Sequence, residues 1–151
     1  MAESGIHIRL RQQEPIPLDA ALGCAPGEVL ALVGPSGSGK TSILRAVAGL
    51  LQVRDGSIRI NGDTWFDTAQ SINLPARRRR VGYVFQNYAL FPHLSALHNV
   101  MEAVLEHAPA ERERRAREAL SRVRLAGLEQ RLPRTLSGGQ QQRVAVARAL
   151  A

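Results

Sequence analysis

The segment Gly34-Pro35-Ser36-Gly37-Ser38-Gly39-Lys40-Thr41-Ser42 is the most informative part of this 151-residue chain. It follows the continuous apolar run 29–33, which predicts a strand buried on both faces of a sheet. The apolar residues that come after it are spaced three and four apart and predict an amphipathic helix: Ile43, Leu44, Val47, Leu50 and Leu51. A glycine-rich loop between a strand and a helix is the setting in which proteins bind phosphate groups.

The chemistry of this loop predicts ATP and Mg²⁺ as its ligands. Gly34, Gly37 and Gly39 permit backbone conformations that turn N–H groups toward phosphate oxygens, and the start of the helix adds a partial positive charge. We expect Lys40, the only lysine in the chain, to contact the β- and γ-phosphates as a catalytic residue. The Thr41 hydroxyl is the candidate Mg²⁺ ligand, and every residue of the quoted segment is a candidate nucleotide contact.

A second phrase, Leu136-Ser137-Gly138-Gly139-Gln140, repeats this chemistry later in the chain. Its small residues let backbone N–H groups approach a phosphate, and Ser137 is suited to cap a helix that we expect to run through Ala151. Followed by Gln141-Gln142-Arg143, and taken with the glycine loop, the phrase resembles the nucleotide-binding subunit of ATP-binding-cassette (ABC) transporters.

The resemblance implies an α/β fold: a P-loop NTPase of the ABC type, with a strand-rich nucleotide-binding half and a helical subdomain. We place the P-loop core and an antiparallel strand region at residues 1–92, and the helical subdomain that ends in the signature helix at residues 93–151. The resemblance covers essentially the whole chain but not a whole family domain, so we expect the C-terminal core strands to be missing.

In the ABC family, the segment that corresponds to residues 136–140 is the signature phrase, and it covers the γ-phosphate that a second subunit holds. The resemblance therefore implies that Ser137, Gly138, Gly139 and Gln140 bind the nucleotide of a second ABC subunit in a head-to-tail dimer. We expect ATP, and not ADP, to drive this dimerisation.

Gln86 lies between the two phrases, in Val84-Phe85-Gln86 followed by Leu90-Phe91-Pro92. This stretch is similar to the Q-loop of ABC ATPases. The resemblance implies that Gln86 is a catalytic residue and a Mg²⁺ contact that orients the attacking water. In the family, the residues after this glutamine meet the transmembrane permease subunits, so the candidate partner contacts are Asn87, Tyr88, Leu90 and Phe91.

Patterns elsewhere predict further elements. Alternation predicts a half-buried strand at 6–10, turn residues flank a strand at 57–60, and a short apolar run predicts a strand at 81–85. A stripe of Ala116, Ala119, Leu120 and Val123 predicts a helix that we expect to stop at Gly127.

Three family features are missing or unusual. No apolar run ends in Asp-Glu, so the glutamate that serves the family as general base, and the histidine after it, have no counterpart. The strand that would normally flank residues 29–33 is also missing, which predicts an uncovered apolar edge and low stability. No aromatic residue precedes Trp65, so His7 or Arg9 would have to stand in beside the adenine. We therefore expect this chain alone to hydrolyse no ATP above background.

The composition limits where in the cell we expect the protein and which classes of partner we expect it to bind. No apolar run approaches the length of a membrane span and no secretory signal opens the chain, so we expect a cytoplasmic protein that reaches the membrane through its permease. The net charge is +7, but basic and acidic residues alternate at 111–124 without aromatic residues among them. That pattern is typical of a solvated helix face, and we expect no nucleic-acid partner.

The leading functional hypothesis is the ATPase subunit of an importer. The stretches 62–67, 73–75 and 79–86 look most like those of the molybdate-type oxyanion importers. Two alternatives stay open: a soluble ABC protein of DNA repair or translation, and a non-catalytic nucleotide-binding remnant. The short interval between Gln86 and Leu136, without heptads, argues against a repair protein with a coiled-coil insertion.

Overall fold

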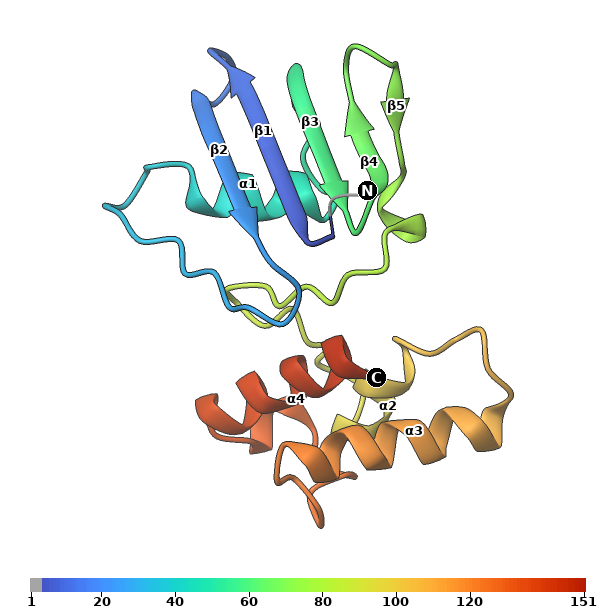
Figure 1. Cartoon of the computed structure of the whole chain (residues 1–151). Coiled ribbons are helices and arrows are strands. Elements are labelled where there is room, and N and C mark those ends of the chain that lie inside the picture. The colour runs from blue at the N-terminus through green and yellow to red at the C-terminus, as the bar shows by residue number, and fades with distance from the viewer. Residues whose placement is uncertain (1–3) are drawn as a thin grey trace. The chain divides into compact units, whose positions relative to one another are not determined.

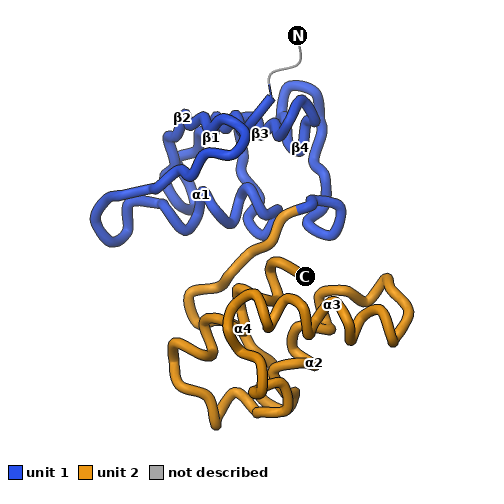
Figure 2. Tube along the Cα trace, turned by 60° about the horizontal axis from the view of Figure 1, so that its bottom comes forward, with its two compact units in different colours: residues 1–80 blue, residues 81–151 orange. Residues whose placement is uncertain are grey.

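The computed structural model describes residues 4–151. The chain divides into two compact units, residues 1–80 and residues 81–151 (Figure 2). The division that we placed after residue 92 from the sequence falls inside the second of these units. Within the described residues, no helix is long and apolar enough to cross a membrane.

An antiparallel sheet of five strands forms the frame of the first unit (Figure 1). Its strands follow the order β2-β1-β3-β4-β5, and β1 lies between β2 and β3, with Ile8 opposite Leu22 on one side and Ile58 on the other. Their bounds are β1 Ile6–Gln12, β2 Leu18–Cys24, β3 Asp55–Ile60, β4 Asp63–Asp67 and β5 Ile72–Asn73. The strands predicted at 6–10 and 57–60 are confirmed.

Helix α1, Lys40–Val47, packs against one face of this sheet (Figure 1). Side chains alternate along β1, so that Ile8 and Leu10 enter the core while Arg9 stays exposed. The core joins the sheet to the helix through Ile8, Leu10, Leu18, Ala46, Val53, Ile58, Trp65 and Phe66. A well-packed sheet thus supports the helix that follows the glycine loop.

Two predicted strands, at 29–33 and 81–85, are wrong. Within residues 4–151, neither segment is paired in a β-ladder. Val29 and Val33 are 96% and 92% exposed, so the apolar run that predicted burial is on the surface. An extended apolar segment becomes a strand only when a neighbour satisfies its backbone groups, and the described chain provides no such neighbour.

The second unit is helical. It contains α2 Ala96–Met101, α3 Pro109–Arg122 and α4 Gly138–Leu150, with a short 3-10 turn at Pro133–Thr135 before α4. Its core consists of Ala96, Leu97, Val100, Ala116, Ala119, Leu120, Leu125, Leu136, Val144 and Ala147. The predicted stripe on α3 is therefore confirmed, but the helix ends before Gly127, and Arg124 takes the left-handed conformation with φ 58°.

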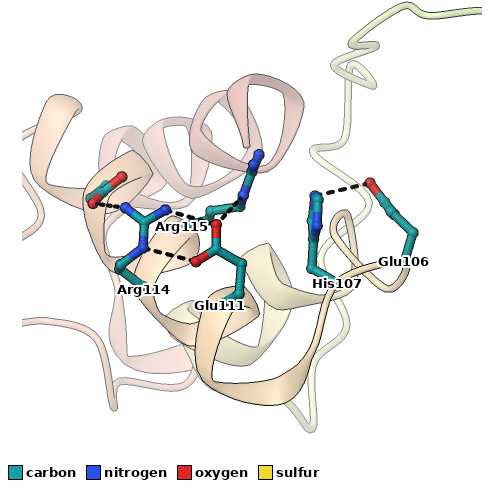
Figure 3. A network of polar contacts seen from close by, with 6 residues as sticks. Glu106, His107, Glu111, Arg114 and Arg115 are labelled. Carbon is teal, nitrogen blue, oxygen red and sulfur yellow. Dashed lines mark hydrogen bonds and ion pairs between the residues drawn. The ribbon is translucent and has the colours of Figure 1, made fainter.

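The charged face of α3 is tied together by ion pairs (Figure 3). Glu111 accepts hydrogen bonds from Arg114 at 2.7 Å and from Arg115 at 2.8 Å, and Arg114 also reaches Glu118. The bond from Arg114, and then that from Arg115, lowers the pKa of the Glu111 carboxyl to about 2. The alternating charges of this stretch pair with one another along the helix.

Candidate functional site

The glycine loop leads directly into α1 and is exposed from Gly34 to Ser38. Gly37 and Gly39 have φ angles of 82° and 85°, in the left-handed region that side chains disfavour. A β-carbon at Gly39 would lie 2.9 Å from Leu18 Cδ2, so the buried Leu18 side chain of β2 would have to shift. Among the described residues no side chain caps α1 at Gly39, which leaves the first-turn N–H groups available to an anion.

Lys40 folds back over this loop. Its Nζ donates to Gly34 O at 2.8 Å, to Pro35 O at 2.6 Å and to Ser38 Oγ at 3.2 Å. These three acceptors use the three donors of the ammonium group and hold it against the loop. An entering phosphate oxygen can replace a carbonyl as acceptor, because the ammonium then gains an anionic partner.

Thr41 and Ser42 occupy the first turn of α1, where Thr41 is exposed and Ser42 is half-buried. A hydroxyl oxygen is a hard ligand of the kind that Mg²⁺ accepts together with waters and phosphate oxygens. Within residues 4–151, no group of three or more His, Cys, Asp and Glu is gathered that could hold a metal ion alone. The exposed Thr41 hydroxyl is therefore suited to be one ligand among several of a Mg²⁺ ion.

The second phrase forms the start of α4. Ser137 Oγ accepts the Gln140 N–H at 3.3 Å, and Gln140 Oε1 accepts the Ser137 N–H at 2.9 Å, which is a complete capping box. Within the described chain, β-carbons at Gly138 and Gly139 would meet no atom within 4 Å. The packing of this chain therefore does not require glycine at either position, which leaves a small, open surface at the helix start.

Gln141 is a residue of this region that the sequence did not single out for a role. Its Nε2 donates to Pro133 O at 3.0 Å and to Leu136 O at 3.1 Å, and so joins the preceding turn to α4. The run Gln140-Gln141-Gln142 in the sequence indicated that a glutamine could bond to the preceding turn. It did not show which of the three does so.

Gln86 is exposed and opens a turn that continues to Ala89. After it, Asn87 is exposed, Tyr88 and Leu90 are half-buried, and Phe91 is 42% exposed. Gln86 and the start of α4 belong to the second unit, whereas Lys40 and the glycine loop belong to the first.

His7 and Arg9, the candidates for contact with adenine, lie on β1 beside a cavity of about 520 Å³. They alternate with Ile8 and Leu10, which pack toward α1, so they lie on the opposite face of the sheet. Ser57 and Arg59 of β3 line the same cavity.

Comparison with protein-family models finds a match to the family described as "ABC transporter" over residues 18–151. The chain is 51% identical over 134 residues to the L-cystine transport system ATP-binding protein TcyN of Escherichia coli K12, covering 83% of this chain and 53% of that protein. It is 43% identical over 149 residues to the molybdenum import ATP-binding protein ModC of Bordetella pertussis, covering 98% of this chain and 40% of that protein. The chain thus spans about half the length, or less, of these relatives.

A solved structure of similar fold is the dimeric ATP-binding cassette MJ0796 in a post-hydrolysis state bound to ADP and Pi. It matches with a TM-score of 0.77 and 32% identity over 97% of this chain and 69% of that one. A second dimeric structure of MJ0796 matches with a TM-score of 0.78 and 33% identity.

Proposed function

This chain belongs to the ABC transporter family, and from that premise we propose that it is the ATP-binding part of an importer ATPase. Its task is to bind Mg-ATP and to couple binding and hydrolysis to the movement of a solute. The permease that carries the solute belongs to other subunits, which hold this chain at the cytoplasmic face of the membrane.

The observation that carries this proposal is the glycine loop at the start of α1. Positive-φ glycines, a helix start without a side-chain cap among the described residues, and the Lys40 ammonium converge on one exposed turn. Together they offer N–H groups and a full positive charge to a chain of phosphates. Lys40 then contacts the β- and γ-phosphates, Thr41 joins the Mg²⁺ shell, and Gln86 orients the attacking water.

The start of α4 binds the nucleotide held by a second ABC subunit. Gly138 and Gly139 are open to the outside, and Ser137 and Gln140 hold the first turn of α4 rigid through the capping box. A phosphate carried by a partner subunit can therefore approach the N–H groups of this turn closely. The related MJ0796 structures are described as dimeric, which supports this arrangement.

Molybdate or a related oxyanion is the transported solute that we favour. The resemblance of the stretches 62–67, 73–75 and 79–86 to molybdate-type importers supports this choice, as does the match to ModC over 98% of the chain. The names of other relatives include cystine and sulfate/thiosulfate, so the choice depends on the permease that accompanies this chain.

Hydrolysis needs a general base in addition to the phosphate contacts. No apolar run of this chain ends in Asp-Glu, which is the pattern of the family's base. We infer that these 151 residues bind ATP without turning it over. ATP hydrolysis that Lys40→Ala abolishes would contradict this inference.

Displacement of a fluorescent ATP analogue tests the ligand class. The glycine loop binds phosphates and not the base, so ATP, ADP and inorganic triphosphate should displace the analogue, whereas AMP should not. Displacement by AMP at the same concentrations as ATP would contradict a β- and γ-phosphate site at Lys40.

A further inference from the structure

We propose that Arg148, near the end of α4, is a positioning residue that fixes the Tyr88–Phe91 loop after Gln86 in the shape with which it meets a partner. The contact that fixes the loop is a property of this chain alone. Its consequence for a permease rests on the proposed function.

The loop has a conformation that its own residues disfavour. Tyr88 and Ala89 have φ angles of 62° and 45°, in the left-handed region that non-glycine residues rarely occupy. The Ala89 N–H donates to Asn87 O at 2.7 Å, which makes a three-residue turn centred on Tyr88. With a positive φ at its centre this turn is of the rare, strained kind. Such a conformation persists only where contacts outside the turn hold it.

Arg148 makes those contacts. Its Nη1 donates to Ala89 O at 2.8 Å and its Nη2 donates to Tyr88 O at 2.8 Å, so one planar group binds two successive carbonyls of the strained turn. The guanidinium carbon also lies 6.0 Å from the centre of the Phe91 ring. Burial lowers the pKa of Arg148, and the loop carbonyls replace water around its charge.

The two ends of the loop are anchored separately. Asn99 of α2 is fully buried; its Oδ1 accepts the Phe91 N–H at 2.8 Å, and its Nδ2 donates to Phe91 O at 3.1 Å. Before the loop, Gly82 lies so close to α4 that a β-carbon there would collide with the Ala149 carbonyl oxygen. Arg148 therefore holds the middle of a segment whose ends already pack on the helices, and Phe91 stays partly exposed above it.

The same helix connects this loop to the second phosphate-binding phrase. Helix α4 has 13 residues, begins just after Ser137 and carries Arg148 in its last turn. Its length is about 20 Å, and a continuous helix of this length transmits a displacement of one end to the other. A partner nucleotide that moves the start of α4 would thus move the loop that Arg148 binds.

NMR of the purified chain with Arg148→Met tests the positioning role. A residue with positive φ has a short distance between its own amide and α protons, and so shows a strong intraresidue NOE between them. We expect this signal at Tyr88 and Ala89 in the unmodified chain and its loss in Arg148→Met, with amide exchange there faster by about tenfold or more. The control is Arg122→Met, which removes an exposed arginine from α3 and should change neither signal.

A second measurement needs no substitution. Bonds from Nη1 and Nη2 to different carbonyls slow the rotation of the guanidinium group, so separate ¹⁵N signals are expected for Arg148 and averaged signals for Arg122. Averaged signals for Arg148, or unchanged NOEs and exchange in Arg148→Met, would overturn the proposal. Neither measurement uses nucleotide or permease, so their failure is distinct from a failure of the proposed function.

Discussion

At the scale of single residues, buried arginines recur where the chain must hold carbonyl groups. Arg79 is 6% exposed and donates to Ala46 O at 2.6 Å, to Val47 O at 2.8 Å and to Leu74 O at 2.8 Å. Two of these carbonyls end α1, where the helix dipole favours a cation. Burial lowers the pKa of Arg79, because little water remains around its charge.

Arg79→Met should therefore destabilise the first unit by about 2–4 kcal/mol, because three buried or half-buried carbonyls lose their donor. Urea unfolding followed by Trp65 fluorescence measures this, since Trp65 is the only tryptophan and lies in the core of the first unit. Arg77→Met, an exposed neighbour, is the matched control. Equal midpoints for the two variants would rule out this role of Arg79.

At the scale of elements, the start of α4 depends on its capping box. Ser137→Ala removes the acceptor of the Gln140 N–H and should destabilise the helix by about 1 kcal/mol. Amide exchange in the first turns of α4 should be correspondingly faster, by roughly fivefold. Ser137→Thr keeps the hydroxyl and should keep most of the protection. Unchanged exchange in Ser137→Ala would show that the cap contributes nothing.

The charged face of α3 predicts a pH dependence (Figure 3). The pKa of Glu111 is about 2 in the folded chain and 4.5 for a free side chain, so its contribution to stability is complete above about pH 4.5. It is lost as the pH falls from 4.5 through 2. When the ¹³C shift of the Glu111 carboxyl is followed against pH, the midpoint should lie near pH 2. In high salt the midpoint should rise, because salt screens the ion pairs. A midpoint at 4.5 would mean that the ion pairs to Arg114 and Arg115 do not form in solution.

Local patterns predicted those elements that local interactions stabilise. Strands β1 and β3, the stripe of α3 and the cap of α4 were all predicted from the sequence, because alternation, helical spacing and Ser137 act within a few residues. Strand β2 was not predicted, since its sequence Leu18–Cys24 has no β-branched residue. The segments 29–33 and 81–85 were wrongly predicted because a strand also requires a neighbour.

Some parts of the candidate site could likewise be predicted from the sequence, and others could not. The glycine loop and the signature phrase could be located because glycine, serine and lysine spacing carries their chemistry. Arg79, Asn99 and Arg148 could not be assigned roles, because a charged or polar residue in a sequence predicts a surface position. Their partners are backbone carbonyls, which no pattern of side chains reveals.

At the scale of the whole molecule, the apolar segment 29–33 is unusual because it is exposed to solvent. Val29 and Val33 are almost completely exposed, and Leu30 is 46% exposed. An apolar segment with unpaired backbone groups favours association with other chains. The segment precedes the glycine loop directly, so association there would also affect the proposed phosphate site.

Val29→Asp should therefore reduce self-association without loss of stability, because the side chain has no buried contacts to lose. Static light scattering measures the association, and Trp65 fluorescence in urea measures the stability. Gln52→Asp introduces the same charge at another exposed position of the first unit and is the control. Equal association of the two variants would exclude segment 29–33 as the cause.

The central claim is that the glycine loop at the start of α1 binds ATP through Lys40. Isothermal titration calorimetry of the purified chain with Mg-ATP tests it most directly, with Lys40→Ala and with Arg45→Ala, which removes an exposed positive charge from the same helix. We predict binding heat for the unmodified chain and for Arg45→Ala, and none for Lys40→Ala. Equal affinities of the unmodified chain and Lys40→Ala, or binding by none of the three, would contradict the account.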